Sequence, residues 1–430
     1  MGRVNRYRVL REAQGFRALR ILADRVSRLW NAAQFLSRQR YLAGEPVPSY
    51  AELCATFQAH ESYKALPSDV AQETLKKVHE SWEAYFEALR AYREGRVHNP
   101  PGLPGYWKDR KTGHRLVRCI PIKHPRSYRV ADGILEIPLP PDLRGPEGTR
   151  LRLRIRGAKR WHGKEGRLEL VWDSARRAWY ASQSVEVQCT AHTERPRKFA
   201  AVDRGARVPV ALAVEGSQEA WVFRSRELWK DYRNLAGRIY RLQALLATRG
   251  QHTSRKLRRL FGRRRERVLA AYRALARTVV RILQKTKVTD LLVGDLTGIR
   301  EDMDFGKLNE LVHNFWSFRE LASALLDACE RAGIRVHPVP EQGTSSHCAV
   351  CGENVVRPLR SRVRCPAGHE IHADVNGALN LLYREPEVRA RAEGRPRWCT
   401  YRWNGHRWVP TESARRSAQD PGSLQAAPAA

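Results

Sequence analysis

Acidic residues are scarce in this 430-residue sequence: it holds 45 Asp and Glu against 78 Lys and Arg, a formal net charge of +33. A folded chain with such an excess repels itself unless a polyanion binds to it. Nucleic acid is the first partner that this balance indicates, and an anionic membrane surface is the alternative. The length is enough for two to four domains.

Long apolar runs are also missing. No stretch of about 20 apolar residues exists, so no segment is predicted to span a bilayer. The opening stretch, MGRVNRYRVLREAQGF, has no apolar core of the kind that a signal peptide requires. We therefore expect a cytoplasmic protein that has no membrane partner.

Cysteine is sparse outside one segment, where Cys348, Cys351 and Cys365 are followed by His369 and His372. In a reducing compartment this clustering indicates metal binding rather than a disulfide. A Cys-x2-Cys-Gly turn offers two thiolates, and a second half completes a tetrahedral, structural zinc site. The usual fourth cysteine is replaced by glycine. We expect His369 as the fourth ligand, with His372 as the alternative, and a degenerate ribbon without metal is the competing interpretation.

Hydrophobic periodicity divides the first half of the chain in two. Residues 1–112 show mostly helical spacing, with Ser68 predicted as the N-cap of one helix, up to the breaker NPPGLPG. Residues 113–196 alternate with period two between Gly, Pro and Asp turns, which predicts a small barrel-like β domain. The alternation places four arginines on one face, which is either solvated or in contact with phosphates. They are Arg150, Arg152, Arg154 and Arg156.

Strands and helices alternate in the second half, which predicts an α/β sheet and makes the whole chain a multidomain α+β protein. The predicted segments are 197–342 with a helical insertion at 226–288, the cysteine segment 343–371, a last segment of the same domain at 372–384, and a tail at 385–430. Tryptophans in the first half of the tail suggest that it docks on the protein. Its last fifteen or so residues have the composition of disorder.

The helical insertion contains the very basic run RKLRRLFGRRRER, which has a single acidic residue. Any helical hairpin can carry a charged outer face, but this density favours contact with nucleic acid. The candidate nucleic-acid-binding residues are Arg255, Lys256, Arg258, Arg259, Arg263, Arg264 and Arg265.

Two acids lie at predicted strand positions where chemistry is plausible. Asp203 ends FAAVD, and Asp374 lies in HADVNGALN after the cysteine segment. A lone acid after a strand is usually a turn or cap residue. Hydrolysis of phosphodiesters by two Mg²⁺ ions, however, requires several carboxylates that converge from different strands.

Together these segments resemble the TnpB proteins of bacterial transposons and their descendants, the type V CRISPR effectors. AAVDRGARVPVALAV, LLVGDLTGIR and GTSSHCAVCG…RCPAGHEIHADVNGALNLL resemble the three RuvC motifs and the zinc ribbon of that family. The resemblance implies a helical recognition unit, a wedge-type β-barrel, and an RNase H-like RuvC domain in which Asp203 and Asp374 hold Mg²⁺. It also implies a guide RNA, a double-stranded DNA target and a bacterial or archaeal, nucleoid-associated location. A homodimer is compatible with it.

One departure from the family pattern decides between functions. The second motif normally carries a metal-binding Glu, but here that position is Gly294, and Asp295 matches a residue that is not a ligand in the family. The favoured hypothesis is therefore an RNA-guided DNA-binding protein with an impaired nuclease. An active endonuclease, in which Asp295 or one of Glu301, Asp302 and Asp304 substitutes, is the alternative. An RNA-binding protein without a guide is the third hypothesis.

Overall fold

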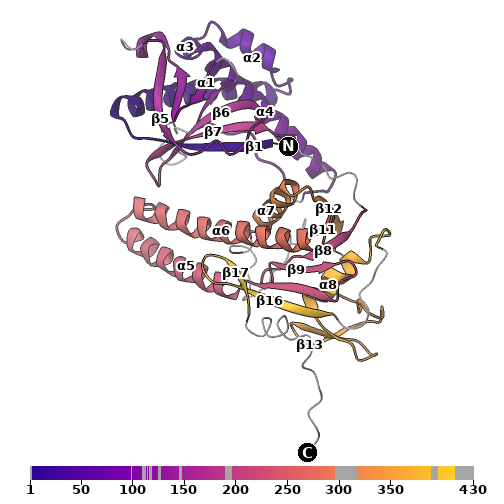
Figure 1. Ribbon diagram of the computed structural model, residues 1–430. Coiled ribbons are helices and arrows are strands. Elements are labelled where there is room, and N and C mark those ends of the chain that lie inside the picture. The colour runs from indigo at the N-terminus through magenta and orange to yellow at the C-terminus, as the bar shows by residue number, and fades with distance from the viewer. Residues whose placement is uncertain are drawn as a thin grey trace, which may run out of the picture. The chain divides into compact units, whose positions relative to one another are not determined.

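The chain forms two compact units, residues 1–188 and 189–430 (Figure 1). The computed structural model describes residues 2–97, 99–108, 113, 115, 119–123, 127–144, 148–188, 196–295, 315, 317–341, 343–388 and 396–411. The finer division of the first unit at residue 112 stays a prediction.

The first unit contains the predicted helices. They are α1 (Ala13–Leu42), α2 (Tyr50–Phe57), α3 (Glu61–Lys64) and α4 (Ser68–Arg93). Ser49 and Glu52 form a reciprocal capping box at the start of α2. The prediction for α4 was wrong by one residue: Pro67 occupies the N-cap position, and Ser68 is already helical. The fixed φ of proline suits a helix entry, so no side-chain cap is used there.

The strands of the first unit form one antiparallel sheet of seven strands in the order β2-β6-β7-β1-β5-β4-β3. Their bounds are β1 (Gly2–Val9), β2 (Cys119–Ile122), β3 (Arg129–Ala131), β4 (Ile134–Pro138), β5 (Arg150–Arg156), β6 (Lys164–Asp173) and β7 (Ala178–Glu186). The arginines of β5 are exposed and alternate with more buried apolar residues, as predicted.

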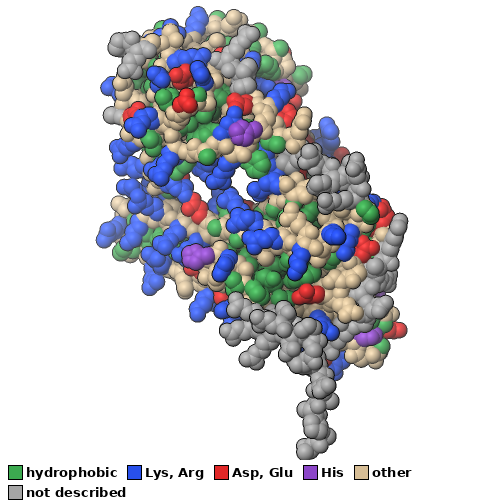
Figure 2. Space-filling model, in the orientation of Figure 1, with side chains coloured by type: hydrophobic (Ala, Val, Ile, Leu, Met, Phe, Trp, Pro, Cys, Tyr) green, Lys and Arg blue, Asp and Glu red, His purple; other side chains and the backbone are tan. Residues whose placement is uncertain are grey.

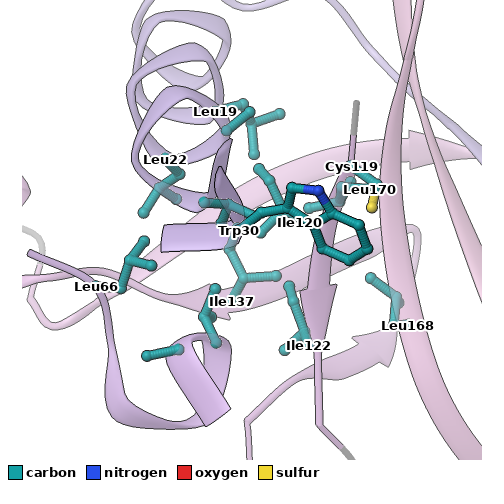
Figure 3. Packing of buried hydrophobic residues seen from close by; sticks show 14 of the residues in the cluster. Leu19, Leu22, Trp30, Leu66, Cys119, Ile120, Ile122, Ile137, Leu168 and Leu170 are labelled. Atoms are coloured by element: carbon teal, nitrogen blue, oxygen red, sulfur yellow. The ribbon is translucent and has the colours of Figure 1, made fainter. Parts of the chain in front are cut away.

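Helices and sheet of this unit share one hydrophobic core (Figure 3). Leu22 and Trp30 of α1 belong to the same buried cluster as Ile120 and Ile122 of β2. The indole ring of Trp30 also stacks on that of Trp107, with 4.4 Å between the ring centroids.

The second unit is built on a mixed sheet of seven strands in the order β12-β11-β8-β9-β10-β16-β17. Their bounds are β8 (Phe199–Asp203), β9 (Val210–Val214), β10 (Glu219–Arg224), β11 (Asp290–Asp295), β12 (Arg335–Pro340), β16 (Arg397–Trp403) and β17 (Trp408–Pro410). Strands β8, β11 and β12 run parallel to one another. Their carboxyl ends therefore meet at one edge of the sheet.

Helices cover both faces of this sheet. One face packs against α5 (Arg226–Ala247), α6 (Arg255–Lys285) and α7 (Phe318–Arg331), and residues 291 and 293 of β11 point to it. The other face packs against α8 (Ala373–Leu382), and Leu292 points to it. Because side chains alternate along a strand, position 294 belongs to the α8 face.

The tail docks on this sheet in its first half, as predicted. β16 pairs in parallel with β10, and Trp403 and Trp408 are buried in the core. The indole N–H of Trp408 donates a hydrogen bond of 2.9 Å to the carbonyl of Ala271 on α6. The disorder predicted for the last fifteen or so residues falls outside the described part of the structure. None of the described helices is long and apolar enough to cross a membrane.

Candidate carboxylate site and metal-binding group

Asp203 is the last residue of β8 and lies at the carboxyl edge of the three parallel strands. Phe199 and Ala201 of the same strand point to the α8 face, so Asp203 points there too. The next residue, Arg204, is buried and donates a hydrogen bond of 2.7 Å to the carbonyl of Gly294. This bond ties the end of β11 to the end of β8.

The prediction of a strand position for Asp374 was wrong: it lies in the first turn of helix α8, which packs on β8 and β9. A glycine allows this helix to approach closely, because a Cβ atom at Gly377 would lie 2.5 Å from Oδ2 of Asp203. A Cβ atom at Gly205 would lie 4.0 Å from Oδ1 of Asp374. The structure thus brings the two predicted carboxylates, which are far apart in sequence, to one place.

A third carboxylate, which the sequence analysis missed, lies over Gly294. A Cβ atom at Gly294 would lie 1.9 Å from Oε1 of Glu341 and 2.4 Å from its Cγ. Glu341 directly follows β12, where Val339 pairs with Gly294. Its side chain therefore fills the space that a side chain at position 294 would occupy.

The electrostatics place these three acids together. Burial raises the pKa of Asp203 well above its ordinary value, and the negative charges of Asp374 and Glu341 raise it further. Burial also raises the pKa of Asp374, which the positive charge of Arg357 opposes. All three acids are half-buried as residues, and Oε1 of Glu341 is fully buried. The charges of both other acids thus act on Asp203, and carboxylates gathered in this way are the ligands that a hard divalent cation prefers.

His372 precedes α8 and lies beside this group rather than with the cysteines. Its Nδ1 is 3.6 Å from Oδ2 of Asp374, and its ring meets that of Trp398 edge to face at 5.8 Å. Burial, with the charges of Arg224 and Arg362, lowers its pKa to about 4. His372 is therefore neutral at physiological pH.

The other acids considered as substitutes in the sequence lie partly or wholly outside the described part of the structure. Asp295 is in β11 and pairs with Pro340 through its backbone, but its side chain lies outside the described part. Glu301, Asp302 and Asp304 also lie outside the described residues.

The four predicted zinc ligands come together, without the alternative His372. The ligand atoms of Cys348, Cys351, Cys365 and His369 all lie within 4.8 Å of one another. Sγ of Cys365 is 3.3 Å from Nδ1 of His369. Burial would raise the pKa of Cys365, but hydrogen bonds from His369 and Cys351 lower it to about 7. The group could bind a metal such as Zn²⁺, and the geometry favours His369 over His372 as the fourth member.

Two glycines shape the turns that present these ligands. Gly352 follows Cys351 with φ of +80°, and Gly368 precedes His369 with φ of +82°. A residue with a Cβ atom rarely adopts this conformation. The glycine in place of the fourth cysteine thus forms a turn that presents His369. The three-stranded sheet of β13 (Val356–Leu359), β14 (Arg362–Arg364) and β15 (Glu370–His372) supports the group.

Side chains of α8 connect the cysteine turn to the carboxylate site. Asn376 accepts a hydrogen bond of 2.9 Å from the backbone N–H of Ala349 and donates one of 2.7 Å to the carbonyl of His347. Asn380 donates to the carbonyls of Thr344 and His347. The Cys348 turn and the helix that carries Asp374 are therefore one hydrogen-bonded assembly.

The predicted basic residues lie on the first three turns of α6. Arg264 is half-buried, with its guanidinium 4.7 Å from the ring centre of Tyr232, and the other six are exposed. Arg265 lies 3.6 Å from Glu320 of α7. Figure 2 shows Lys and Arg side chains gathered over α5 and α6.

Comparison with known proteins identifies the family. The chain is 30% identical over 413 residues to the TnpB-like protein ORF457 of Acidianus two-tailed virus, which covers 88% of this chain and 86% of that protein. The chain belongs to the TnpB-like family. Within this TnpB-like chain, residues 182–300 match the family OrfB_IS605, described as a probable transposase, and residues 318–381 match the Cas12f1-like TNB domain.

Further relatives of the TnpB-like chain are more distant. It is 25% identical over 225 residues to the CRISPR-associated endodeoxyribonuclease Cas12f1 of Sulfoacidibacillus thermotolerans, covering 50% of this chain and 52% of that one. Among solved structures, the mini-RNA-guided endonuclease CRISPR-Cas_phi3 matches 92% of this chain and 94% of its own, with 13% identity and a TM-score of 0.49. The Cas12f1–sgRNA–target DNA complex matches at 14% identity, 90% and 100% coverage, and a TM-score of 0.37.

Proposed function

We propose that this TnpB-like protein is an RNA-guided DNA endonuclease whose carboxylate site cleaves phosphodiesters with Mg²⁺. The convergence of Asp203 and Asp374 on one half-buried face is the observation that carries the proposal. Buried acids with raised pKa values, held close together, are typical of catalytic sites.

The donor set fits the metal. Carboxylate oxygens are the ligands that Mg²⁺ prefers, and Asp203 and Asp374 would hold it. Bound Mg²⁺ supplies charge stabilisation at the scissile phosphate and activates water. The chain itself contributes the placement of the carboxylates, through the strand end of β8 and the close packing of α8 on it.

The remaining segments of the chain are assigned domain roles by their resemblance to the family. We assign residues 197–342 and 372–384 to an RNase H-like RuvC domain, with 226–288 as inserted helices and 343–371 as a zinc ribbon. Residues 1–112 would recognise the nucleic-acid duplex, and 113–196 would form the wedge. The net charge of +33 suits a protein that holds a guide RNA and a DNA target by their phosphates.

Gly294 supports a second candidate, an RNA-guided DNA-binding protein whose nuclease is impaired. Loss of one metal ligand removes transition-state charge stabilisation, which lowers the rate by a hundredfold or more. Such a protein would still bind its target and could block transcription.

The test is cleavage of a matched target. The protein is produced with the DNA that flanks its gene, the bound RNA is sequenced, and linear DNA matching the variable end of that RNA is offered in Mg²⁺. We expect cleavage that EDTA stops and that Asp374→Ala abolishes, while target binding persists. Binding without cleavage would support the impaired binder. A heterogeneous RNA pool would instead indicate an unguided RNA-binding protein.

A further inference from the structure

We propose that Glu341 is the third metal ligand of the carboxylate site and replaces, from the neighbouring strand, the Glu that the chain lacks at position 294. The inference rests on the proposed nuclease function and deepens it. It assigns a catalytic role to a residue outside the three sequence motifs.

The register of the sheet explains how Glu341, which is far from position 294 in sequence, can take the place of a metal ligand at that position. Val293 pairs with Val202, so position 294 lies beside Asp203 on the next strand. Parallel strands lie about 4.8 Å apart, so a side chain at 294 would reach the metal held by Asp203. That place belongs to the α8 face of the sheet, where Asp374 also lies.

Glu341 occupies this place. Its Oε1, Cγ and Cδ all lie within 2.5 Å of where a Cβ atom at Gly294 would be. The carboxylate therefore lies directly over the backbone of residue 294, not beyond it. A side chain at 294 and the present position of Glu341 exclude each other, so Gly294 is the residue that admits Glu341.

Charge supports the same arrangement. Glu341 is one of the two acids whose negative charge acts on Asp203, and Asp374 is the other. Asp203 and Glu341 come from the ends of two parallel strands and Asp374 from the first turn of a helix, and the charges of Glu341 and Asp374 both act on Asp203. Several carboxylates that converge from different elements are what a two-metal nuclease requires.

The local sequence of β12 suits this role. In the segment PVPEQG, Pro338 and Pro340 lack backbone N–H groups, and Glu341 comes at the point where β12 ends. Val339, two residues before it, packs against the core of the α8 face. The strand end is thus fixed on the same face as the acid that follows it.

The decisive experiment compares four proteins with their bound RNA: wild type, Glu341→Gln, Gly294→Glu, and the double variant Gly294→Glu/Glu341→Gln. Cleavage of the matched target in Mg²⁺ is measured beside target binding. Mn²⁺ binding is measured by calorimetry without target DNA, as a readout independent of catalysis. Glu219→Gln is the matched control, because Glu219 is exposed at the start of β10, at the opposite end of the sheet.

We expect Glu341→Gln to cut at least a hundredfold more slowly and to bind Mn²⁺ at least tenfold more weakly, with target binding unchanged. Gly294→Glu alone should not increase cleavage, because its Cβ atom would displace Glu341. The double variant should regain at least a tenth of the wild-type rate. Glu219→Gln should match wild type.

The outcomes separate the two proposals. Wild type that binds its target but cuts it in neither Mg²⁺ nor Mn²⁺ overturns the nuclease function. Wild type that cuts, beside a Glu341→Gln variant within threefold of it in both rate and Mn²⁺ affinity, overturns the role of Glu341 alone. Increased cleavage by the single Gly294→Glu variant would also overturn the role of Glu341. It would show that no side chain supplies the third ligand in the wild-type protein.

Discussion

At the scale of single residues, the acids near the two ends of β11 have opposite electrostatic surroundings. Asp290, at its start, has no exposed side-chain surface and is surrounded by donors. Arg335 binds it through two nitrogens at 2.8 and 2.7 Å, and His337, Thr289 and Arg197 add further hydrogen bonds. At the other end, the pKa values of Asp203 and Asp374 stay raised although the positive charge of Arg357 opposes the shift. Of these two groups, only the carboxylate site is suited to bind a cation.

We predict that Asp290→Asn lowers the free energy of unfolding by about 1–3 kcal/mol at pH 7, because it leaves Arg335 without its charge partner. Burial alone would raise the pKa of Asp290, but its hydrogen bonds hold it below the ordinary value. Its contribution is therefore complete above about pH 4, the ordinary pKa, and is lost as the pH falls further. Denaturant unfolding of both proteins across pH 3–7 measures this.

Asp327→Asn is the matched control for that prediction. Asp327 pairs with Arg331 one turn later on α7, and both side chains are partly exposed. An exposed pair of this kind contributes about 0.5 kcal/mol or less. Equal effects of the two substitutions would show that the buried network at Asp290 carries no special stability.

The carboxylate site was only partly predictable from sequence. Asp203 and Asp374 are found by motif, because Asp203 ends an apolar strand and Asp374 follows the cysteine segment. Glu341 is not, because its place over Gly294 depends on the pairing of β11 with β12, which residue spacing does not specify. One signal was available: in IRVHPVPE, apolar residues alternate with others along a predicted strand that is followed by an acid, and FAAVD likewise ends in an acid.

At the scale of elements, periodicity predicted the order of strands and helices, because alternation and helical spacing are local properties. It did not predict that the cysteine turn is bonded to α8. That link runs through Asn376 and Asn380, whose partners lie about 30 residues earlier in the chain. The metal-binding group thus supports the helix that carries Asp374, an inference that no local pattern contains.

We predict that the purified protein holds about one zinc ion per chain and that Cys351→Ser loses it. Cys351 is exposed, so the substitution costs little packing and reports on the metal. We expect a lower melting temperature and faster hydrogen exchange in α8, because the turn that Asn376 holds is released. Cys54→Ser in the first unit is the control. A zinc content near zero in wild type, with a melting temperature unchanged by chelator, would contradict the prediction.

At the scale of the whole molecule, the net charge of +33 is the property that bears most on the choice of binding partner. It predicted a polyanionic partner before any motif was considered, and the family supports that choice. Composition could not say where the partner binds. The structure places a group of exposed basic side chains on α6, among them Arg258, Arg259 and Arg263.

We predict that changing these three arginines together to Gln weakens nucleic-acid binding and reduces the dependence of log K on log[salt] by about 1–3, roughly one for each phosphate that is no longer neutralised. The triple change to Lys is the control, because it keeps the charge and should keep the slope. Filter binding of the guide RNA at low and at moderate salt measures both. If Gln and Lys variants share the wild-type slope, α6 presents a solvated face, and the partner binds elsewhere on the protein.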